Sequence, residues 1–264
     1  MLAHQRHSVI LDAVRTHGGV RVADLVGELG VSDMTVRRDI GELSRRGLVA
    51  RVHGGAAAVG GRSSEEPGFA AKSTLATGAK RAIAALAATL VEPGASVALS
   101  AGTTTVEVAH ALRDLAGLTV VTNSPRVADV LHDPADHDRT VVLTGGVRTP
   151  SDALVGPVAV AGLAGLHVDV LFLGVHGLDA TAGLTTPNLD EADTDRALLR
   201  TAGRVVVVAD STKWGVVGLS SIAGLDAVDV LVTDTGLGPD ARAAVDHHLG
   251  ELLLAPLEQE GPPS

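Results

Sequence analysis

Hydrophobic residues in the first 50 positions recur at helical spacing and predict three helices. Their apolar faces comprise Ile10, Leu11 and Val14; Val22, Leu25, Val26 and Leu29; and Val36, Ile40 and Leu43. Glycines end the first two helices, and Ser32 is placed to cap the third, which we expect over residues 33–46. A short β-hairpin is expected over residues 47–55. This order of elements is that of a winged helix-turn-helix.

The pattern changes after residues 56–68, a stretch rich in Gly, Ser and Pro that we interpret as a linker. Beyond it, continuous apolar runs alternate with helical patterns. The runs cover residues 96–99, 119–121, 141–143, 168–173, 205–209 and 228–232. Strands buried on both faces have continuous hydrophobic residues, so we expect a mostly parallel sheet covered by helices. The predicted fold class is α/β, a winged helix-turn-helix followed by a Rossmann-like domain.

The composition of the chain excludes several kinds of functional site. The 264 residues include no Cys, which excludes disulfides, thiolate metal sites and cysteine nucleophiles. The N-terminus lacks the apolar run of a signal peptide, and no apolar run of the chain is long enough for a membrane span. We therefore expect a cytoplasmic protein with no membrane partner. Motifs for nucleotide-binding P-loops, dinucleotides, serine hydrolases and HExxH metal sites are all missing. We expect no catalytic residue, no metal and no cofactor.

The net charge of -10 is unevenly distributed. Residues 1–62 hold nine Arg and six acids, whereas residues 63–264 hold twelve Lys or Arg and twenty-five acids. A basic N-terminal part on an acidic body is typical of a protein that faces phosphate at one end. An ordinary solvated surface would explain the same excess.

The third helix carries candidate DNA contacts near its N-terminus. Thr35, Arg37 and Arg38 lie off its apolar face, where a recognition helix reaches base edges. Ser32 and the adjacent Asp33 lie at the helix start, where free N–H groups suit a backbone phosphate. In the hairpin, Arg51 and His53 are candidates for phosphate or minor-groove contacts, and we expect Asp39 to orient an adjacent arginine. The alternative is a helical dimerisation module whose arginines are merely solvated.

The run that ends at Leu99 leads into a Gly/Thr loop and a helix start. Backbone N–H groups and hydroxyls at such a loop favour an anion, although a simple helix cap has the same sequence. Further polar residues follow the other apolar runs, at the edge of the sheet where open α/β folds bind ligands. The candidate residues of this site are Ser100, Gly102, Thr103, Thr104, Thr105, Asn123, Gly145, Gly146, Glu191, Asp210 and Lys213. Lys213 can balance a phosphate, while Glu191 and Asp210 can accept hydrogen bonds from sugar hydroxyls, restrain Lys213, or simply be solvated.

Two stretches of the N-terminal part, residues 32–40 and 51–56, resemble the signature of DeoR-family repressors. Over residues 70–236 the chain resembles the C-terminal domain of that family, most closely at residues 183–192 and 209–214. The resemblance implies a ribose-5-phosphate isomerase-like fold and a repressor of carbohydrate metabolism genes that a phosphorylated sugar releases from double-stranded operator DNA. It also implies that the Gly/Thr loop holds phosphate. Ser100 and Ala101 stand where the family usually has Asp-Ser, which removes an acceptor for a sugar hydroxyl.

These patterns define four segments and an assembly. We expect a DNA-binding domain at residues 1–57, a linker at 58–73, an effector-sensing and oligomerisation domain at 74–254 and a flexible tail at 255–264. A homodimer or homotetramer would match a palindromic operator and keep the protein at the nucleoid. A sugar-phosphate isomerase or deaminase, or an adaptor without a ligand, remain the alternatives, and we expect that the chain is not an enzyme.

Overall fold

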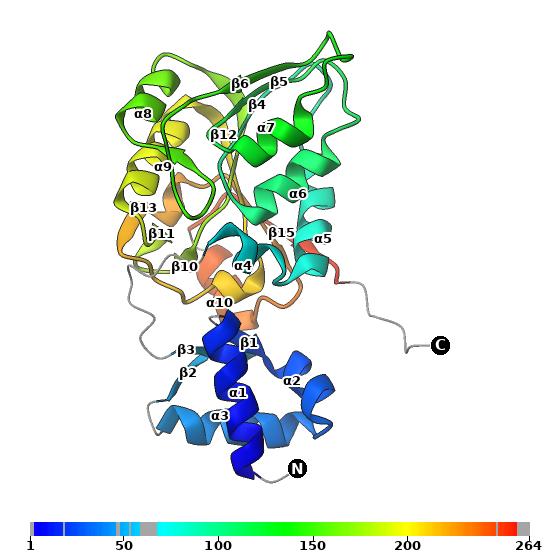
Figure 1. Cartoon of the computed structure of the whole chain (residues 1–264), viewed down its shortest axis with the longest axis vertical. Helices are drawn as coiled ribbons and strands as arrows, with labels where there is room; N and C mark the ends of the chain where they lie inside the picture. Colours follow the sequence, from blue (N-terminus) through cyan, green and yellow to red (C-terminus); the bar gives the residue numbers. More distant parts are fainter. Residues whose placement is uncertain are drawn as a thin grey trace. The chain divides into compact units, whose positions relative to one another are not determined.

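The structure is a computed structural model that describes residues 3–17, 19–45, 48–52, 54–58, 68–246 and 248–257. The chain divides into two compact units, Met1–Glu65 and Glu66–Ser264 (Figure 1). The expected linker and tail fall partly on residues 59–67 and 258–264, which lie outside the described residues.

The N-terminal unit packs three helices against a small antiparallel sheet with the strand order β1-β3-β2. Its elements are α1 (Ala3–His17), β1 (Gly19–Arg21), α2 (Val22–Leu29), α3 (Asp33–Arg45), β2 (Val49–Val52) and β3 (Gly55–Ala58). Its core consists of Ile10, Val14, Val22, Leu25, Leu29, Val36, Ile40, Leu43, Val49 and Ala56. The three helices and their apolar faces are therefore confirmed.

The hairpin of this unit differs from its expected form. It continues to Ala58, and β1 pairs with β3 as a third strand. Gly55 permits this pairing, because a Cβ atom there would lie 2.1 Å from the carbonyl oxygen of Val20. Residues 56–58 are therefore strand rather than linker, and Ala56 is buried in the core of this unit. Three consecutive alanines gave no alternating pattern from which a strand could be predicted.

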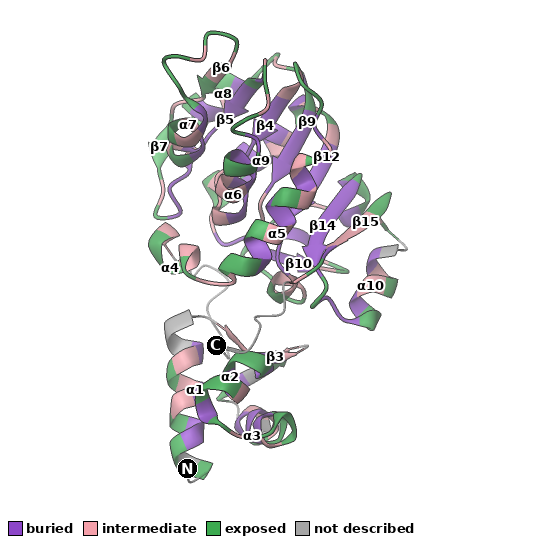
Figure 2. Cartoon of the chain, turned by 90° about the vertical axis from the view of Figure 1, so that its right-hand side faces the viewer, coloured by how far each residue is buried: buried purple, intermediate pink, exposed green. Residues whose placement is uncertain are grey.

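The C-terminal unit is built on a seven-stranded parallel sheet with the order β15-β14-β12-β9-β4-β5-β6. Its strands are β4 (Ser96–Leu99), β5 (Thr119–Thr122), β6 (Thr140–Leu143), β9 (Val168–Leu173), β12 (Ala202–Val208), β14 (Val230–Asp234) and β15 (Glu251–Ala255). The first six correspond to the predicted runs, and β15 is an additional strand. Figure 2 shows the buried character of the central strands.

Helices cover both faces of this sheet (Figure 1). One face packs against α5 (Thr77–Ala88), α6 (Thr103–Ala111) and α7 (Pro125–Leu131), and the other against α8 (Pro157–Leu163) and α9 (Leu189–Thr201). Alternate residues of β9 serve the two cores: Phe172 belongs to the first and Leu171 to the second. Continuous apolar runs are therefore required, as the sequence indicated.

The remaining described elements of the C-terminal unit are separate from the large sheet and from the five helices named above. They are α4 (Phe69–Ser73), β7 (Val147–Arg148), β8 (Leu154–Val155), β10 (Gly177–Asp179), β11 (Gly183–Thr186), η1 (Ser211–Lys213), β13 (Ser220–Ala223), η2 (Leu225–Ala227) and α10 (Pro239–Asp246). Strands β10, β11 and β13 form a second, antiparallel sheet. Helix α4 lies where we expected only linker. Among the described residues, no helix is both long and apolar enough to cross a membrane.

Candidate functional site

The exposed face of α3 presents two arginines. Arg37 and Arg38 are exposed, and Thr35 is half-buried. The Ser32 hydroxyl accepts a hydrogen bond from the Thr35 amide at 3.3 Å, which is the expected cap. Asp33 accepts hydrogen bonds from the Arg37 guanidinium at 2.5 and 3.2 Å, so this acid holds Arg37 along the helix surface. Arg38 is exposed to solvent.

Asp39 has a structural role that differs from the expected one. It is buried, and its carboxylate accepts hydrogen bonds of 2.6 and 3.1 Å from Arg6 of α1, with His7 at 3.5 Å. Burial alone would raise the pKa of Asp39, but the bonds to Arg6 and the charges nearby lower it overall. Asp39 therefore ties α3 to α1 rather than orienting an adjacent arginine, because the helical geometry turns its side chain inward.

A hollow of about 330 Å³ lies between α3 and the hairpin. It is lined by Val22, Arg37, Ile40, Arg51, Val52, Gly54 and Gly55. Two arginines, Arg37 of α3 and Arg51 of β2, thus line the same concave surface. Such an arrangement suits the phosphates and base edges of one duplex groove. His53, the other candidate in the wing, lies outside the described residues.

The C-terminal unit has a cavity at the carboxyl ends of β4, β5 and β9. Six of the eleven candidate residues line it: Gly102, Thr103, Thr104, Asn123, Glu191 and Lys213. Ten further residues complete the lining: Lys72, Ala101, Ser151, Ala153, Gly174, Val175, His176, Thr186, Asp195 and Ile222. The sequence therefore predicted six of the sixteen residues that line the cavity, and the other ten were missed.

Hydrogen bonds hold the Gly/Thr loop in place at the start of α6. The Thr105 hydroxyl donates to the Gly102 carbonyl at 2.9 Å, and the side-chain oxygen of Asn123 accepts a bond from the Ala101 amide at 2.8 Å. The amide nitrogen of Asn123 in turn donates to the Leu154 carbonyl at 3.2 Å. Asn123 therefore links the loop after β4 to the segment before α8, which places the first turn of α6 at the cavity wall.

The other five candidates, Ser100, Thr105, Gly145, Gly146 and Asp210, do not line the cavity. The Ser100 hydroxyl is buried and accepts a bond from the Gly174 amide at 2.9 Å, and Thr105 is wholly buried. Gly146 lets the chain pass close to β8, since a Cβ atom there would lie 2.5 Å from the Val155 carbonyl oxygen. Gly145 precedes it in the same turn. Asp210 begins η1 by accepting a bond from the Thr212 amide at 3.1 Å.

Two carboxyl groups from one face of α9 form the acidic side of the cavity. Glu191 accepts hydrogen bonds from the hydroxyls of Thr149 at 2.9 Å and Thr186 at 3.0 Å. Asp195 lies one turn further along the helix and is buried. Burial, together with the negative charge of Glu191, raises the pKa of Asp195 well above its usual range. The lining of the cavity thus includes the hydrogen-bonded carboxyl group of Glu191 and the carboxyl group of Asp195, whose raised pKa favours the neutral acid.

Lysines provide the basic side. Lys72 of α4 and Lys213 of η1 both line the cavity, and Lys80 of α5 lies close enough for their charges to influence it. Burial lowers the pKa of Lys80 to about 8, against the opposing effect of Asp210. These three residues are the only lysines among the 21 basic residues of the chain. Because lysine is so rare in this chain, its three positions could have been singled out from the sequence as candidate site residues. That criterion would have added Lys72 and Lys80 to Lys213.

Comparisons with known proteins agree with this architecture. Residues 6–60 match the model of the DeoR-like helix-turn-helix domain, and residues 76–235 match that of the DeoR C terminal sensor domain. The HTH-type transcriptional regulator GlpR of Haloferax volcanii is 39% identical over 93% of this chain and 95% of its own length. The glycerol-3-phosphate regulon repressor of Escherichia coli is 31% identical over 93% of this chain and 96% of its own.

Among solved structures, ribose 5 phosphate isomerase A from Neisseria gonorrhoeae aligns with 53% of this chain and 54% of its own, with 17% identity and a TM-score of 0.37. This similarity is too low to support an argument about the fold, which is therefore described from the strand order of the C-terminal unit itself.

Proposed function

Because this chain belongs to the DeoR family of transcriptional regulators, we propose that it represses genes of carbohydrate metabolism and that a phosphorylated sugar releases it from its operator. The cavity of the C-terminal unit carries this proposal. Its lining combines the amide groups at the start of α6 with Lys72 and Lys213, which suits a phosphate. The lining also includes Glu191 and Asp195, which suit the hydroxyls of a sugar.

The geometry of the N-terminal unit supports a set of DNA contacts. Arg38 and Arg37 are positioned to grip the O6 and N7 atoms of guanine in the major groove, while Arg51 and the capped start of α3 contact phosphates. Asp33 would release Arg37 as it engages a base. The names of the relatives given above, a regulator and a regulon repressor, support repression as the outcome.

We further propose that the protein acts as a homodimer or a homotetramer. Two N-terminal units related by two-fold symmetry would match the two halves of a palindromic operator. Effector binding would change operator affinity only if the effector binds two arrangements of the assembly unequally.

The DNA-binding part is tested by replacing Arg37 and Arg38 with alanine and measuring affinity for an operator fragment identified by footprinting. Each lost bidentate contact should weaken specific binding about 10- to 100-fold, since such contacts are worth roughly 1–3 kcal/mol. Arg81→Ala is the matched control, because Arg81 is an exposed arginine of the other unit. Operator affinity that is unchanged in the double variant would rule out α3 as the recognition helix.

The effector is sought by titrating the protein with ribose 5-phosphate, fructose 1-phosphate, glucosamine 6-phosphate and inorganic phosphate. Trp214 is the only tryptophan and directly follows Lys213, so its fluorescence should report binding. A sugar phosphate that binds and lowers operator affinity supports the proposal. If none of the sugar phosphates binds, the cavity is not an effector site of this class.

A further inference from the structure

Strand β6 (Thr140–Leu143) forms one edge of the large sheet, and its outer side is uncovered. Among the described strands it pairs with β5 alone. Three of its four residues are exposed, whereas in β15, at the opposite edge, only Glu251 is exposed. Proteins usually protect such an edge with charged residues or proline, because its free N–H and C=O groups can pair with another strand. Residues 140–147 contain neither.

An exposed apolar surface surrounds this strand. Val142 and Leu143 are 38% and 43% exposed, and Val147 and Val158 are 71% and 63% exposed. A Cβ atom at Gly145 would lie 3.5 Å from the Cγ1 atom of Val158, so the start of α8 lies against the turn that follows β6. We call these four side chains the β6 patch. Exposed apolar side chains that gather in this way are typical of an interaction surface.

The backbone of β6 can pair with an identical strand. The amides of Thr140 and Thr144 both donate at 3.0 Å to carbonyl oxygens on the side of β5. These groups alternate in direction from one residue to the next, so the N–H and C=O groups of Val141 and Leu143 face away from β5. A second, antiparallel β6 related by a two-fold axis at Val142 would set Val141 of each copy opposite Leu143 of the other. Each of these pairs would exchange both of its N–H···O bonds.

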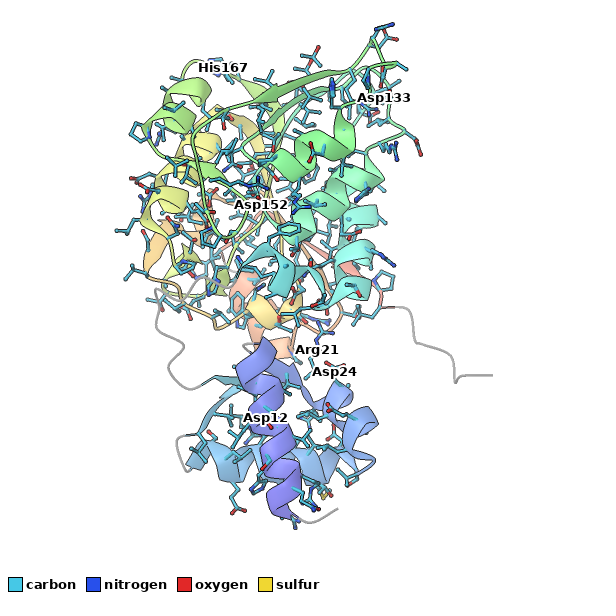
Figure 3. The ribbon with its side chains drawn as sticks, in the orientation of Figure 1. Asp12, Arg21, Asp24, Asp133, Asp152 and His167 are labelled. Carbon is cyan, nitrogen blue, oxygen red and sulfur yellow. The ribbon has the colours of Figure 1, made fainter. Side chains whose placement is uncertain are left out.

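The charges at the two ends of β6 favour the antiparallel arrangement. The loop before the strand, residues 132–139, carries three aspartates and one arginine, and its Asp133 is exposed. Beyond the other end, the exposed Arg148 is held by the buried Asp152 and lies within the influence of Asp129. Figure 3 labels Asp133 and Asp152 and shows them well apart. Antiparallel pairing places each acidic loop beside the partner's Arg148, whereas parallel pairing would set the two acidic loops against each other.

We propose that β6 and the β6 patch bind a second copy of this chain, with the two β6 strands antiparallel about a two-fold axis at Val142. This inference rests on the homo-oligomer of the proposed function and assigns a surface to it. An isologous contact uses the same surface on both copies, which must therefore be complementary to itself. An uncharged apolar patch and an antiparallel strand edge both meet that condition. Two DNA-binding units are thereby held in one assembly, so that binding of the second half of an operator becomes intramolecular.

The substitution Val142→Lys in the full chain tests this surface. Two ammonium groups would face each other at the axis, where like charges directly opposite are unfavourable. Because the substitution acts on both copies, self-association should weaken about 10- to 100-fold. In sedimentation equilibrium the unaltered chain should form an assembly, and the variant should give half its mass. Val217→Lys is the matched control, because Val217 is 47% exposed and lies outside the β6 patch, and it should leave the mass unchanged.

A single cysteine gives a second measurement, because the chain contains no Cys. Directly opposed residues of a non-hydrogen-bonded antiparallel pair have Cα atoms about 4.5 Å apart, within the range that a disulfide spans. Val142→Cys should therefore form a covalent homodimer when it is incubated with oxidised glutathione. Val217→Cys should remain uncrosslinked under the same conditions.

Thermal unfolding midpoints equal to that of the unaltered chain show that the variants are folded. If Val142→Lys keeps the mass of an unaltered chain that self-associates, the contact lies elsewhere, so this inference is wrong and the proposed homo-oligomer stands. Equal cross-linking of the two cysteine variants has the same meaning. If the unaltered chain is a monomer at every concentration, the inference and the proposed homo-oligomer are both wrong.

Discussion

Replacing Lys80 with methionine should make the C-terminal unit more stable at neutral pH. Lys80 is buried, and its pKa is lowered from 10.5 to about 8. A shift of roughly 2.5 units corresponds to about 3 kcal/mol of unfavourable free energy for carrying the charge in the folded state, at about 1.4 kcal/mol per unit. Methionine has a similar length and removes that cost. It also removes the hydrogen bond to the Lys72 carbonyl, worth about 1 kcal/mol, but this oxygen still accepts a bond from the Leu75 amide.

The expected gain is therefore about 2 kcal/mol at pH 7. Urea unfolding followed through Trp214 measures it, because this residue packs against the core of the C-terminal unit. The sign of the pH dependence is also determined. Between pH 8 and 10.5 the unfolded chain binds a proton at Lys80 that the folded chain does not, so the unaltered protein gains stability as pH rises through this window. The advantage of Lys80→Met should accordingly shrink by roughly 1 kcal/mol between pH 7 and 9.

Arg81→Met serves as the control, since its exposed ion pair with Glu107, 3.8 Å long, should contribute little. A variant Lys80→Met that is less stable than the unaltered chain at pH 7 would refute the argument. So would a stability gap that stays constant between pH 7 and 9. A stabilising substitution at this position would mean that the chain keeps Lys80 for a purpose other than folding.

Two further substitutions test buried acids. Asp39→Asn should destabilise the N-terminal unit by about 1–3 kcal/mol, because Arg6 loses a charge-assisted partner. The pKa of Asp39 is lowered, so the loss should be seen in thermal unfolding at pH 7 and should begin to shrink only below about pH 4, as pH falls from the unfolded pKa toward the lower folded pKa. Asp195→Asn should stabilise the C-terminal unit at pH 7, because burial beside Glu191 raises the pKa of Asp195 and penalises its ionised form in the folded state. The unaltered chain should regain that difference as pH falls, and equal urea midpoints of both chains at pH 7 would contradict this view of Asp195.

The sequence allowed the fold class to be predicted because periodicity depends on local residues alone. The spacing of Val36 and Ile40 identifies the buried face of α3 without knowledge of where the helix lies in the fold. Likewise, the continuous apolar run 168–173 indicates a strand that is buried on both sides. The strand Glu251–Ala255 escaped notice because a short apolar run does not distinguish a strand from a buried helical turn.

Contacts between distant segments could not be obtained in the same way. Asp39 pairs with Arg6, 33 positions earlier, and this depends on how α1 crosses α3. Lys72 follows a stretch rich in Gly and Ser, so nothing in its neighbourhood suggested a helix or a cavity. The loop residues Gly102, Thr103 and Thr104 were found because a strand followed by a Gly/Thr turn and a helix start is itself a local pattern.

The order of strands in the large sheet has a consequence for the synthesis of the protein. The core of the N-terminal unit requires nothing beyond Ala56, whereas β4 pairs with β9 about 70 residues later and the sheet reaches its outer strand only at Ala255. Domains generally fold as units while the chain leaves the ribosome, N-terminal first. A nascent chain can thus complete the core of its N-terminal unit well before the large sheet is complete. A chain that ends before Glu251 would lack β15, the strand that pairs with β14 at one edge of that sheet.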